Sequence, residues 1–167
     1  SASSILAALG RLVSPVFAPL GFGDWKATVA TITGLIAKEN VVATFGVLYG
    51  GLEEVAENGD EIWGAVAQNF TQLSAYSFMI FNLLCAPCFA AMGAIKREMN
   101  SPKWTCIAIG YMCVFAYAVA LIVYQIGGIF TGNVNVVGLI CALAVLAFII
   151  YMLVRPYKEA EKLTVKA

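Results

Sequence analysis

The stretch Gly34-Leu35-Ile36-Ala37-Lys38-Glu39-Asn40-Val41-Val42 decides how this chain folds, because it places three strongly polar side chains inside an apolar run. The run covers residues 27–49, about the 20 residues that an α-helix needs to cross a bilayer core of about 30 Å. Lys38, Glu39 and Asn40 would then lie near mid-depth. An ionised side chain there costs roughly 2.5 to 3.5 kcal/mol, so such groups usually face a water-filled cavity or a partner. The stretch is therefore a candidate functional site, or else a structural pair satisfied by a neighbouring helix.

The composition indicates a membrane protein. Of the 167 residues, 61% are hydrophobic and 12% are charged, whereas soluble domains are about half apolar. The net charge is zero and no basic stripe is interleaved with aromatic residues, so we expect no nucleic-acid partner. The chain has no histidine, which removes the commonest transition-metal ligand and the usual general base. It also has no phosphate-binding P-loop, and we expect no enzyme activity from this chain.

Four apolar runs are long enough to cross a bilayer: residues 27–49, 71–94, 104–127 and 133–154. Ahead of them, residues 1–20 carry large apolar side chains at helical spacing opposite a face of small residues. This pattern predicts an amphipathic helix that lies at the membrane surface or packs on the bundle. We therefore expect an all-α, polytopic membrane bundle of about four transmembrane helices. Its parts would be an N-terminal amphipathic helix and turn (1–26), the transmembrane bundle (27–154) and a cytoplasmic tail (155–167).

The loop charges predict the orientation of the chain, because cytoplasmic loops are enriched in Lys and Arg. Loop 50–70 is acidic and has no basic residue, loop 128–132 is uncharged, and loop 95–103 and the tail are basic. This alternation predicts four crossings with both termini in the cytoplasm, and with Arg11 and Lys26 on the cytoplasmic side. The acidic loop is either a simple solvated loop or a means of concentrating cations at the outer mouth.

A second interruption lies at Leu83-Leu84-Cys85-Ala86-Pro87-Cys88. Pro87 has no N–H to give to the carbonyl of Leu83, so the helix should kink or break and free that oxygen. Cys85 and Cys88, three residues apart, would share a face if the helix persists, and thiolates suit borderline and soft divalent metals. The alternative is that both thiols are small apolar packing groups. We expect packing to be the role of Cys106, Cys113 and Cys141.

Four motifs in one order resemble the C-terminal membrane region of the ferrous iron transport protein B family, FeoB. They are Gly21-Phe22-Gly23-Asp24-Trp25-Lys26, Gly34-Leu35-Ile36-Ala37-Lys38-Glu39, Leu83-Leu84-Cys85-Ala86-Pro87-Cys88 and Gly93-Ala94-Ile95-Lys96-Arg97-Glu98. The resemblance covers nearly the whole chain. It implies a bacterial inner-membrane protein that imports Fe(II), with a cytosolic GTPase and two Gate regions related to nucleoside-transporter folds. This chain is similar to the second Gate region and the last spans.

The resemblance also implies which parts of the transporter are missing from this chain, and which substrate and partners the chain has. The GTPase and the first Gate region are absent from this sequence, and the first residue is not Met, so we expect a piece of a longer transporter. No cofactor would be bound tightly, Fe(II) would be the transported substrate, and GTP would act only through the missing domain. The partners would be the lipid bilayer, Fe(II) and the rest of the same transporter, and a homo-oligomer stays open.

For the site, the resemblance implies an Fe(II) path through the membrane. The cysteines of this family have been proposed to line such a path, and Pro87-Cys88 matches the family's Pro-Cys element. We expect the path to be lined by Cys85, Cys88, the Leu83 carbonyl and the polar break at Glu39 and Asn40. Lys38 would balance charge or deter passage when the site is empty.

Three alternatives remain at this point. The chain could be a Gate-type carrier of an organic solute such as a nucleoside. It could be a membrane thiol-redox protein that uses Cys85 and Cys88, although a site at mid-depth would exchange poorly with a soluble partner. It could also be only a structural half of a transporter whose ion path lies elsewhere.

Overall fold

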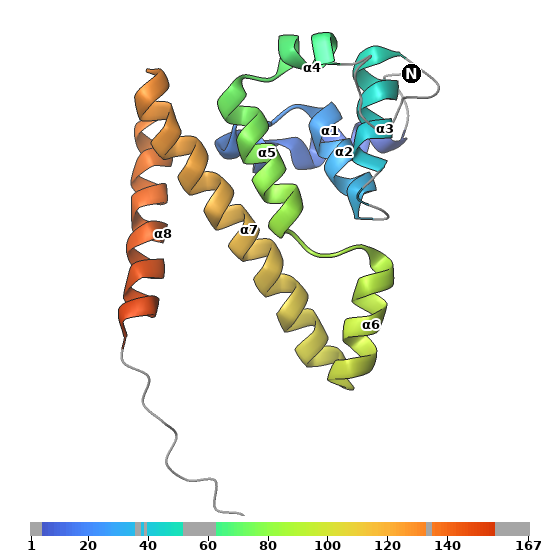
Figure 1. Cartoon of the computed structure of the whole chain (residues 1–167), viewed down its shortest axis with the longest axis vertical. Helices are drawn as coiled ribbons and strands as arrows, with labels where there is room; N and C mark the ends of the chain where they lie inside the picture. The colour runs from blue at the N-terminus through green and yellow to red at the C-terminus, as the bar shows by residue number, and fades with distance from the viewer. Residues whose placement is uncertain (1–4, 36–37, 39, 52–62, 133–134, 156–167) are drawn as a thin grey trace, which may run out of the picture.

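The chain folds into helices throughout the part that the computed structural model describes, which is residues 5–35, 38, 40–51, 63–132 and 135–155. Figure 1 shows their arrangement. In chain order they are α1 (Ile5–Phe17), the 3-10 helix η1 (Ala18–Leu20), α2 (Trp25–Gly34), α3 (Asn40–Phe45), the π-helix η2 (Gly46–Gly50), α4 (Trp63–Asn69), α5 (Gln72–Leu84), α6 (Phe89–Met99), α7 (Pro102–Thr131) and α8 (Val136–Val154). The all-α prediction is confirmed.

Three helical segments within these ranges are long and apolar enough to cross a membrane: Gln72–Met99, which contains α5 and α6, then α7 and α8. The α1–η1 segment and α2 meet at 97° and would add a fourth span only if the bent pair is counted as one. The fold is therefore a polytopic membrane bundle of three or four spans with an N-terminal helix, as predicted.

The predicted span over residues 27–49 is wrong, because the chain reverses in the middle of it. A continuous helix would separate Thr33 from Thr44 by roughly 16 Å at 1.5 Å per residue, yet their hydroxyl oxygens lie 2.9 Å apart. Likewise, Tyr49 Oη donates to the Asp24 carboxylate at 2.6 Å. Helix α2 therefore runs into the molecule and α3 and η2 run back out beside it. This hairpin brings Lys38 against the carbonyl end of α5, although its side chain stays exposed.

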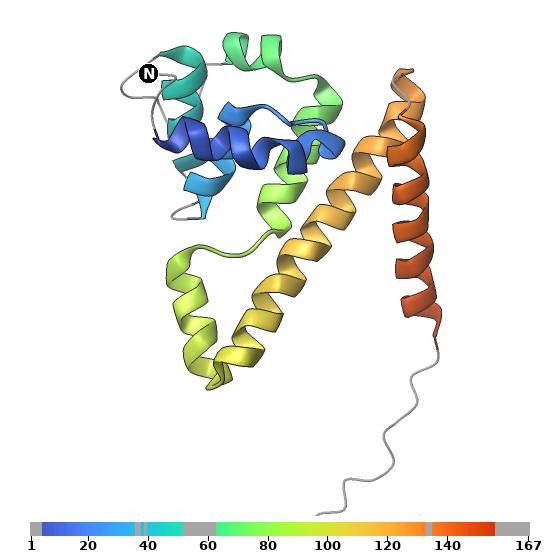
Figure 2. The same cartoon turned by 180° about the vertical axis from the view of Figure 1, so that it is seen from behind.

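Helix α1 lies across the long axis of the molecule, as Figure 2 shows from behind. Its small face, which includes Ala7 and Gly10, is buried and packs on α2. A Cβ added at Gly10 would come within 2.8 Å of the Trp25 carbonyl oxygen, so a larger residue would push the two helices apart. Its large apolar side chains point outward, with Ile5 89% and Leu12 77% exposed. The predicted amphipathic helix therefore packs on the bundle and leaves its apolar face exposed.

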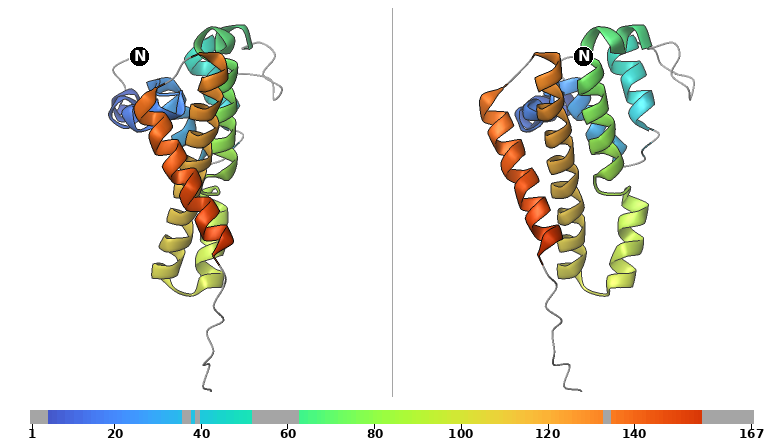
Figure 3. Two further views of the ribbon diagram at one scale, coloured as in Figure 1. Left: turned by 90° about the vertical axis from the view of Figure 1, so that its left-hand side faces the viewer. Right: turned by 60° about the vertical axis from the view of Figure 1, so that its left-hand side comes forward.

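Helix α7 is the centre of the bundle, with α5 packed on one side and α8 on the other (Figure 3). Ala116 and Ala120 of α7 have no exposed surface, and the Ser77 hydroxyl of α5 donates to the Ala120 carbonyl at 3.3 Å. Small residues let helices approach where lipid supplies no hydrophobic drive. The small side chains of Ala116 and Ala120 therefore allow close packing around α7.

One end of the bundle is basic. The α6–α7 turn, which holds Lys96, Arg97 and Lys103, lies at the same end as the C-terminus of α8, opposite α4 (Figure 1). Lys26 lies instead at the outer end of the α2–α3 hairpin, where its ammonium is 4.7 Å from the centre of the Tyr49 ring. The orientation of the termini relative to the membrane stays a prediction.

Candidate functional site

Two helix breaks, far apart in the sequence, meet in the structure. Helix α2 ends at Gly34, and α5 ends at Leu84 before the chain resumes in α6 at Phe89. The backbone N–H of Phe89 donates to the carbonyl of Leu35 at 3.1 Å. The break that follows α2 therefore lies directly against the break between α5 and α6.

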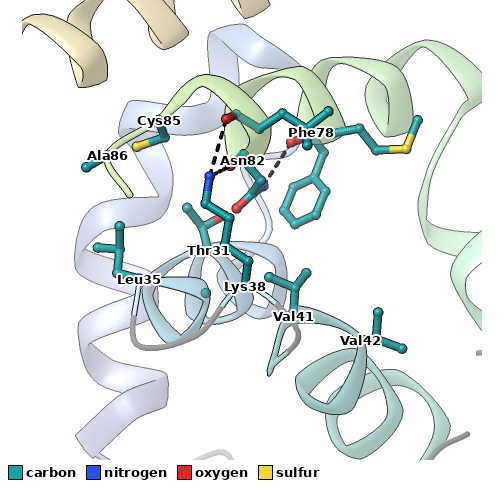
Figure 4. Close-up of a pocket in the computed structure, with 12 residues that line it drawn as sticks. Thr31, Leu35, Lys38, Val41, Val42, Phe78, Asn82, Cys85 and Ala86 are labelled. Carbon is teal, nitrogen blue, oxygen red and sulfur yellow. Dashed lines mark hydrogen bonds between the residues drawn. The ribbon is translucent and has the colours of Figure 1, made fainter. Parts of the chain in front are cut away.

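Lys38 occupies the carbonyl end of α5. Its ammonium donates to the carbonyl oxygens of Asn82 at 2.7 Å and of Leu83 at 3.3 Å, as Figure 4 shows. In a continuous helix these oxygens would accept from residues 86 and 87, but Pro87 has no N–H to donate. The carbonyl that the sequence predicts to be freed thus accepts a hydrogen bond from a cationic side chain.

The direction of the helices makes this place attractive to cations. The C-terminus of a helix carries about half a negative charge, from its unpaired carbonyl groups. Helix α2 has 10 residues and α5 has 13, and both point their C-termini at the breaks. In transporters with broken helices, such C-terminal ends coordinate the coupling cations. The site therefore presents backbone oxygens that carry the partial negative charge of two helix C-termini.

A cavity of about 340 Å³ opens beside these carbonyls. Most of its lining is apolar, and its polar groups come from Thr31, Lys38, Asn82 and Cys85 (Figure 4). The Asn82 amide nitrogen donates to the carbonyl of Phe78 at 2.8 Å, which fixes the orientation of the amide and keeps its oxygen as an acceptor. Sequence reasoning missed Thr31 and Asn82, because single polar residues in apolar helices are not distinctive.

The thiols are paired differently from the prediction. Cys85 lines the cavity, and its sulfur lies 3.7 Å from that of Cys113 on α7. Cys88 is the half-buried N-cap of α6. Because the helix does not persist across residues 85–88, Cys85 and Cys88 do not share the helical face that their spacing suggested. Cys113, which we expected to be a packing residue, lies against the Cys85 sulfur and is not among the residues that line the cavity.

The remaining predicted residues contribute less to the described site. Asn40 begins α3 and is exposed. Glu39 and the acidic residues of loop 50–70 (Glu53, Glu54, Glu57, Asp60 and Glu61) lie outside the described residues. Among the residues that the structure does describe, no three Cys, Asp or Glu side chains gather as a closed metal site would require. The described donors are two thiols and the oxygens around Lys38.

The chain is similar to known membrane proteins. Residues 1–102 match the model of the Gate family, described as "Nucleoside recognition". The "Fe(2+) transporter FeoB" of Staphylococcus aureus (strain COL) is 41% identical over 128 residues, 76% of this chain and 18% of the relative. The protein of the same name from Methanocaldococcus jannaschii is 39% identical over 128 residues, 77% of this chain and 18% of the relative. The one from Campylobacter jejuni is 38% identical over 119 residues, 71% of this chain and 19% of the relative.

No solved structure matches the chain significantly. The chain spans about a fifth of the length of the relatives it matches, or slightly less. The motif resemblance to ferrous iron transporters is confirmed by relatives that carry the FeoB name. The chain is a membrane protein that belongs to the Gate family.

Proposed function

We propose that this chain is the membrane part of an Fe(II) importer and that the crossing of the two helix breaks is one station on the ion path. The observation that carries the proposal is the position of Lys38, whose ammonium is held by the carbonyl oxygens of Asn82 and Leu83. Oxygens arranged to hold one cation are also suited to hold another. The names of the relatives supply the identity of the ion.

The sulfur atoms extend this ligand set in a way that suits Fe(II). Two thiolates on one tetrahedral ion with metal–sulfur bonds of about 2.3 Å lie about 3.8 Å apart. The sulfurs of Cys85 and Cys113 are 3.7 Å apart, so one ion could bridge them with little movement of α5 or α7. A mixed and incomplete ligand set suits transport, because the ion must be able to leave. Cys88, Glu39 and Asn40 would serve the same path on either side of this station.

The wider setting is part of the same proposal. The importer would lie in a bacterial inner membrane with the basic C-terminal tail of this chain in the cytoplasm, and a GTPase domain outside this chain would gate it. The first Gate region would supply the rest of the pore wall, within one chain or in a homo-oligomer.

A neutral organic solute fits the site less well. The Gate family is described by nucleoside recognition, and a cavity of about 340 Å³ is within the range of small-molecule sites. However, a cation interacts more strongly with the carbonyl groups of two helix C-termini than the neutral hydroxyl and N–H donors of a nucleoside do. A thiol-redox role would have to use Cys85 with Cys113, whose sulfurs lie close together. The experiments below also test these two alternatives.

The test is Fe(II) uptake by cells that carry the protein at its natural length. We expect the Cys85→Ser/Cys113→Ser double variant to lower uptake by about ten-fold, the loss typical of weakening the ligands of a metal site. Cys141→Ser is the matched control, because Cys141 is an exposed thiol on α8 away from the cavity. It should leave uptake unchanged.

Three results would contradict the proposed function, and the third would indicate a redox role. One is full Fe(II) uptake in the double variant when the protein is present at its normal level. The second is thermal stabilisation of the purified protein by uridine but not by Fe(II), which would favour an organic solute. A reversible Cys85–Cys113 disulfide that alone determines activity would favour the redox role.

A further inference from the structure

We infer that the Lys38 ammonium is the resting occupant of the cation site and that a divalent ion must displace it in order to pass. Lys38 would then set the concentration of divalent ion at which transport is half-maximal, and it would exclude monovalent ions. The inference rests on the proposed function, which names the site but not what fills it between ions.

The ammonium lies at the carbonyl oxygens that the proposed function assigns to the transported ion. Its two acceptors, the carbonyls of Asn82 and Leu83, belong to α5, while Lys38 itself lies in the break between α2 and α3. The bonds therefore join two separate parts of the molecule. Lys38 and Cys85 line the same cavity, so an ion that reached Cys85 would arrive beside the ammonium.

The ammonium can leave without disturbing the core. Lys38 is an exposed residue despite its two hydrogen bonds, and the cavity beside it offers about 340 Å³ of space. By contrast, the residues behind the site are buried, including Phe78 and Ala86. Displacement thus requires a side-chain movement into the cavity and no unpacking of α5.

Competition with a tethered cation discriminates by charge. A lysine held by the backbone acts at a high effective concentration, in the millimolar range for short tethers. A monovalent ion has the same charge as the ammonium and gains little by replacing it. A divalent ion has twice the charge and can also bind the Cys85 and Cys113 sulfurs, which an ammonium does not use as ligands. The displaced ammonium would stay in the cavity and repel a second ion.

The first test is the concentration dependence of Fe(II) uptake. Lys38→Met removes the charge with little change in length, and we expect it to lower KM by about ten-fold, a typical coupling between two ligands. Lys38→Arg keeps a cation and should stay within about two-fold of the natural protein. Lys26→Met is the control, because the Lys26 ammonium lies over the Tyr49 ring and not at the α5 carbonyls.

The second test uses the unmodified protein and so does not depend on whether a variant folds. Mn(II) serves as an air-stable divalent probe, and the rate at which an amine-reactive reagent labels each lysine is followed by mass spectrometry. We expect Mn(II) to increase labelling of Lys38 several-fold, because displacement frees its amine. Labelling of Lys26 should not change.

The inference would be overturned by a raised or unchanged KM in Lys38→Met, or by Mn(II) that leaves Lys38 labelling unchanged or lowers it. Its failure is distinct from failure of the proposed function. Suppose that the Cys85→Ser/Cys113→Ser variant loses uptake, while Lys38→Met leaves KM unchanged and Mn(II) leaves Lys38 labelling unchanged. The proposed ion path would then be supported, and only the displacement of Lys38 would be wrong.

Discussion

Replacing Gly21 by alanine is expected to lower the free energy of unfolding by about 2 to 5 kcal/mol, the sum of a backbone term and an overpacking term. Gly21 follows η1 with φ 86° and ψ 3°, and its N–H donates to the carbonyl of Ala18 at 3.0 Å. Residues that carry a Cβ rarely adopt this left-handed backbone conformation. A Cβ would also overlap the ring of Tyr124 on α7, which covers the turn.

Gly132 provides a matched control for this prediction. It caps α7 with φ 78° and ψ 3°, nearly the same backbone conformation, but no atom lies within 4 Å of where its Cβ would be. Gly132→Ala should therefore cost only the backbone term of about 1 to 2 kcal/mol. The measurement is unfolding of the protein in detergent micelles by a denaturing detergent. Equal losses in the two variants would show that Tyr124 does not press on the turn.

Phe22→Ala is expected to cost about 3 to 5 kcal/mol, as large-to-small changes of buried aromatic residues do. Phe22 is 2% exposed. Its ring stacks on Phe17 at 5.4 Å between centroids and meets Phe78 edge-on at 5.2 Å. Phe78 belongs to α5 and also lines the cavity. The loss of packing against Phe78 should therefore disturb the site and lower Fe(II) uptake as well.

The control for this second change is Phe115→Ala. Phe115 is 38% exposed and stacks on Tyr111 at 6.0 Å on the surface of α7. Losing such a pair should cost about 0.5 to 1.5 kcal/mol. The two variants can be compared in the same unfolding titration. If both lost the same stability, the aromatic cluster around Phe22 would not be the part of the core that holds the N-terminal turn on α5.

The features that the sequence predicted well are local ones. The interruption of the helix near Pro87 follows from a single missing N–H, which needs no knowledge of the neighbours. The end of α5 at Leu84 and the start of α6 at Phe89 fall around that residue. The close packing at Ala116 and Ala120 likewise follows from residue size. Length and hydropathy were sufficient to predict a helical membrane bundle.

The features that the sequence could not predict depend on contacts between distant residues. An apolar run of this length is compatible with one membrane-spanning helix and equally with two half-helices that fold back on each other. The reversal between α2 and α3 is visible only in pairs such as Thr33 with Thr44. In the same way, no spacing rule links Cys85 to Cys113, 28 residues later on another helix. Of the residues that the sequence singled out, Lys38, Leu83 and Cys85 line one cavity, whereas Thr31 and Asn82 were not predicted.

The most direct test of the central claim is where a bound Fe(II) ion cuts the chain. Bound Fe(II) reduces hydrogen peroxide to hydroxide and a hydroxyl radical, which cleaves the backbone close to the metal, and ascorbate reduces the resulting Fe(III) back to Fe(II). Mass spectrometry can map the cuts in the purified natural-length protein. If the two helix breaks form one cation site, cleavage should concentrate at residues 82–86 and at the α2–α3 break, and excess Mn(II) should suppress it. Cleavage confined to other segments, or cleavage that Mn(II) does not suppress, would contradict the account.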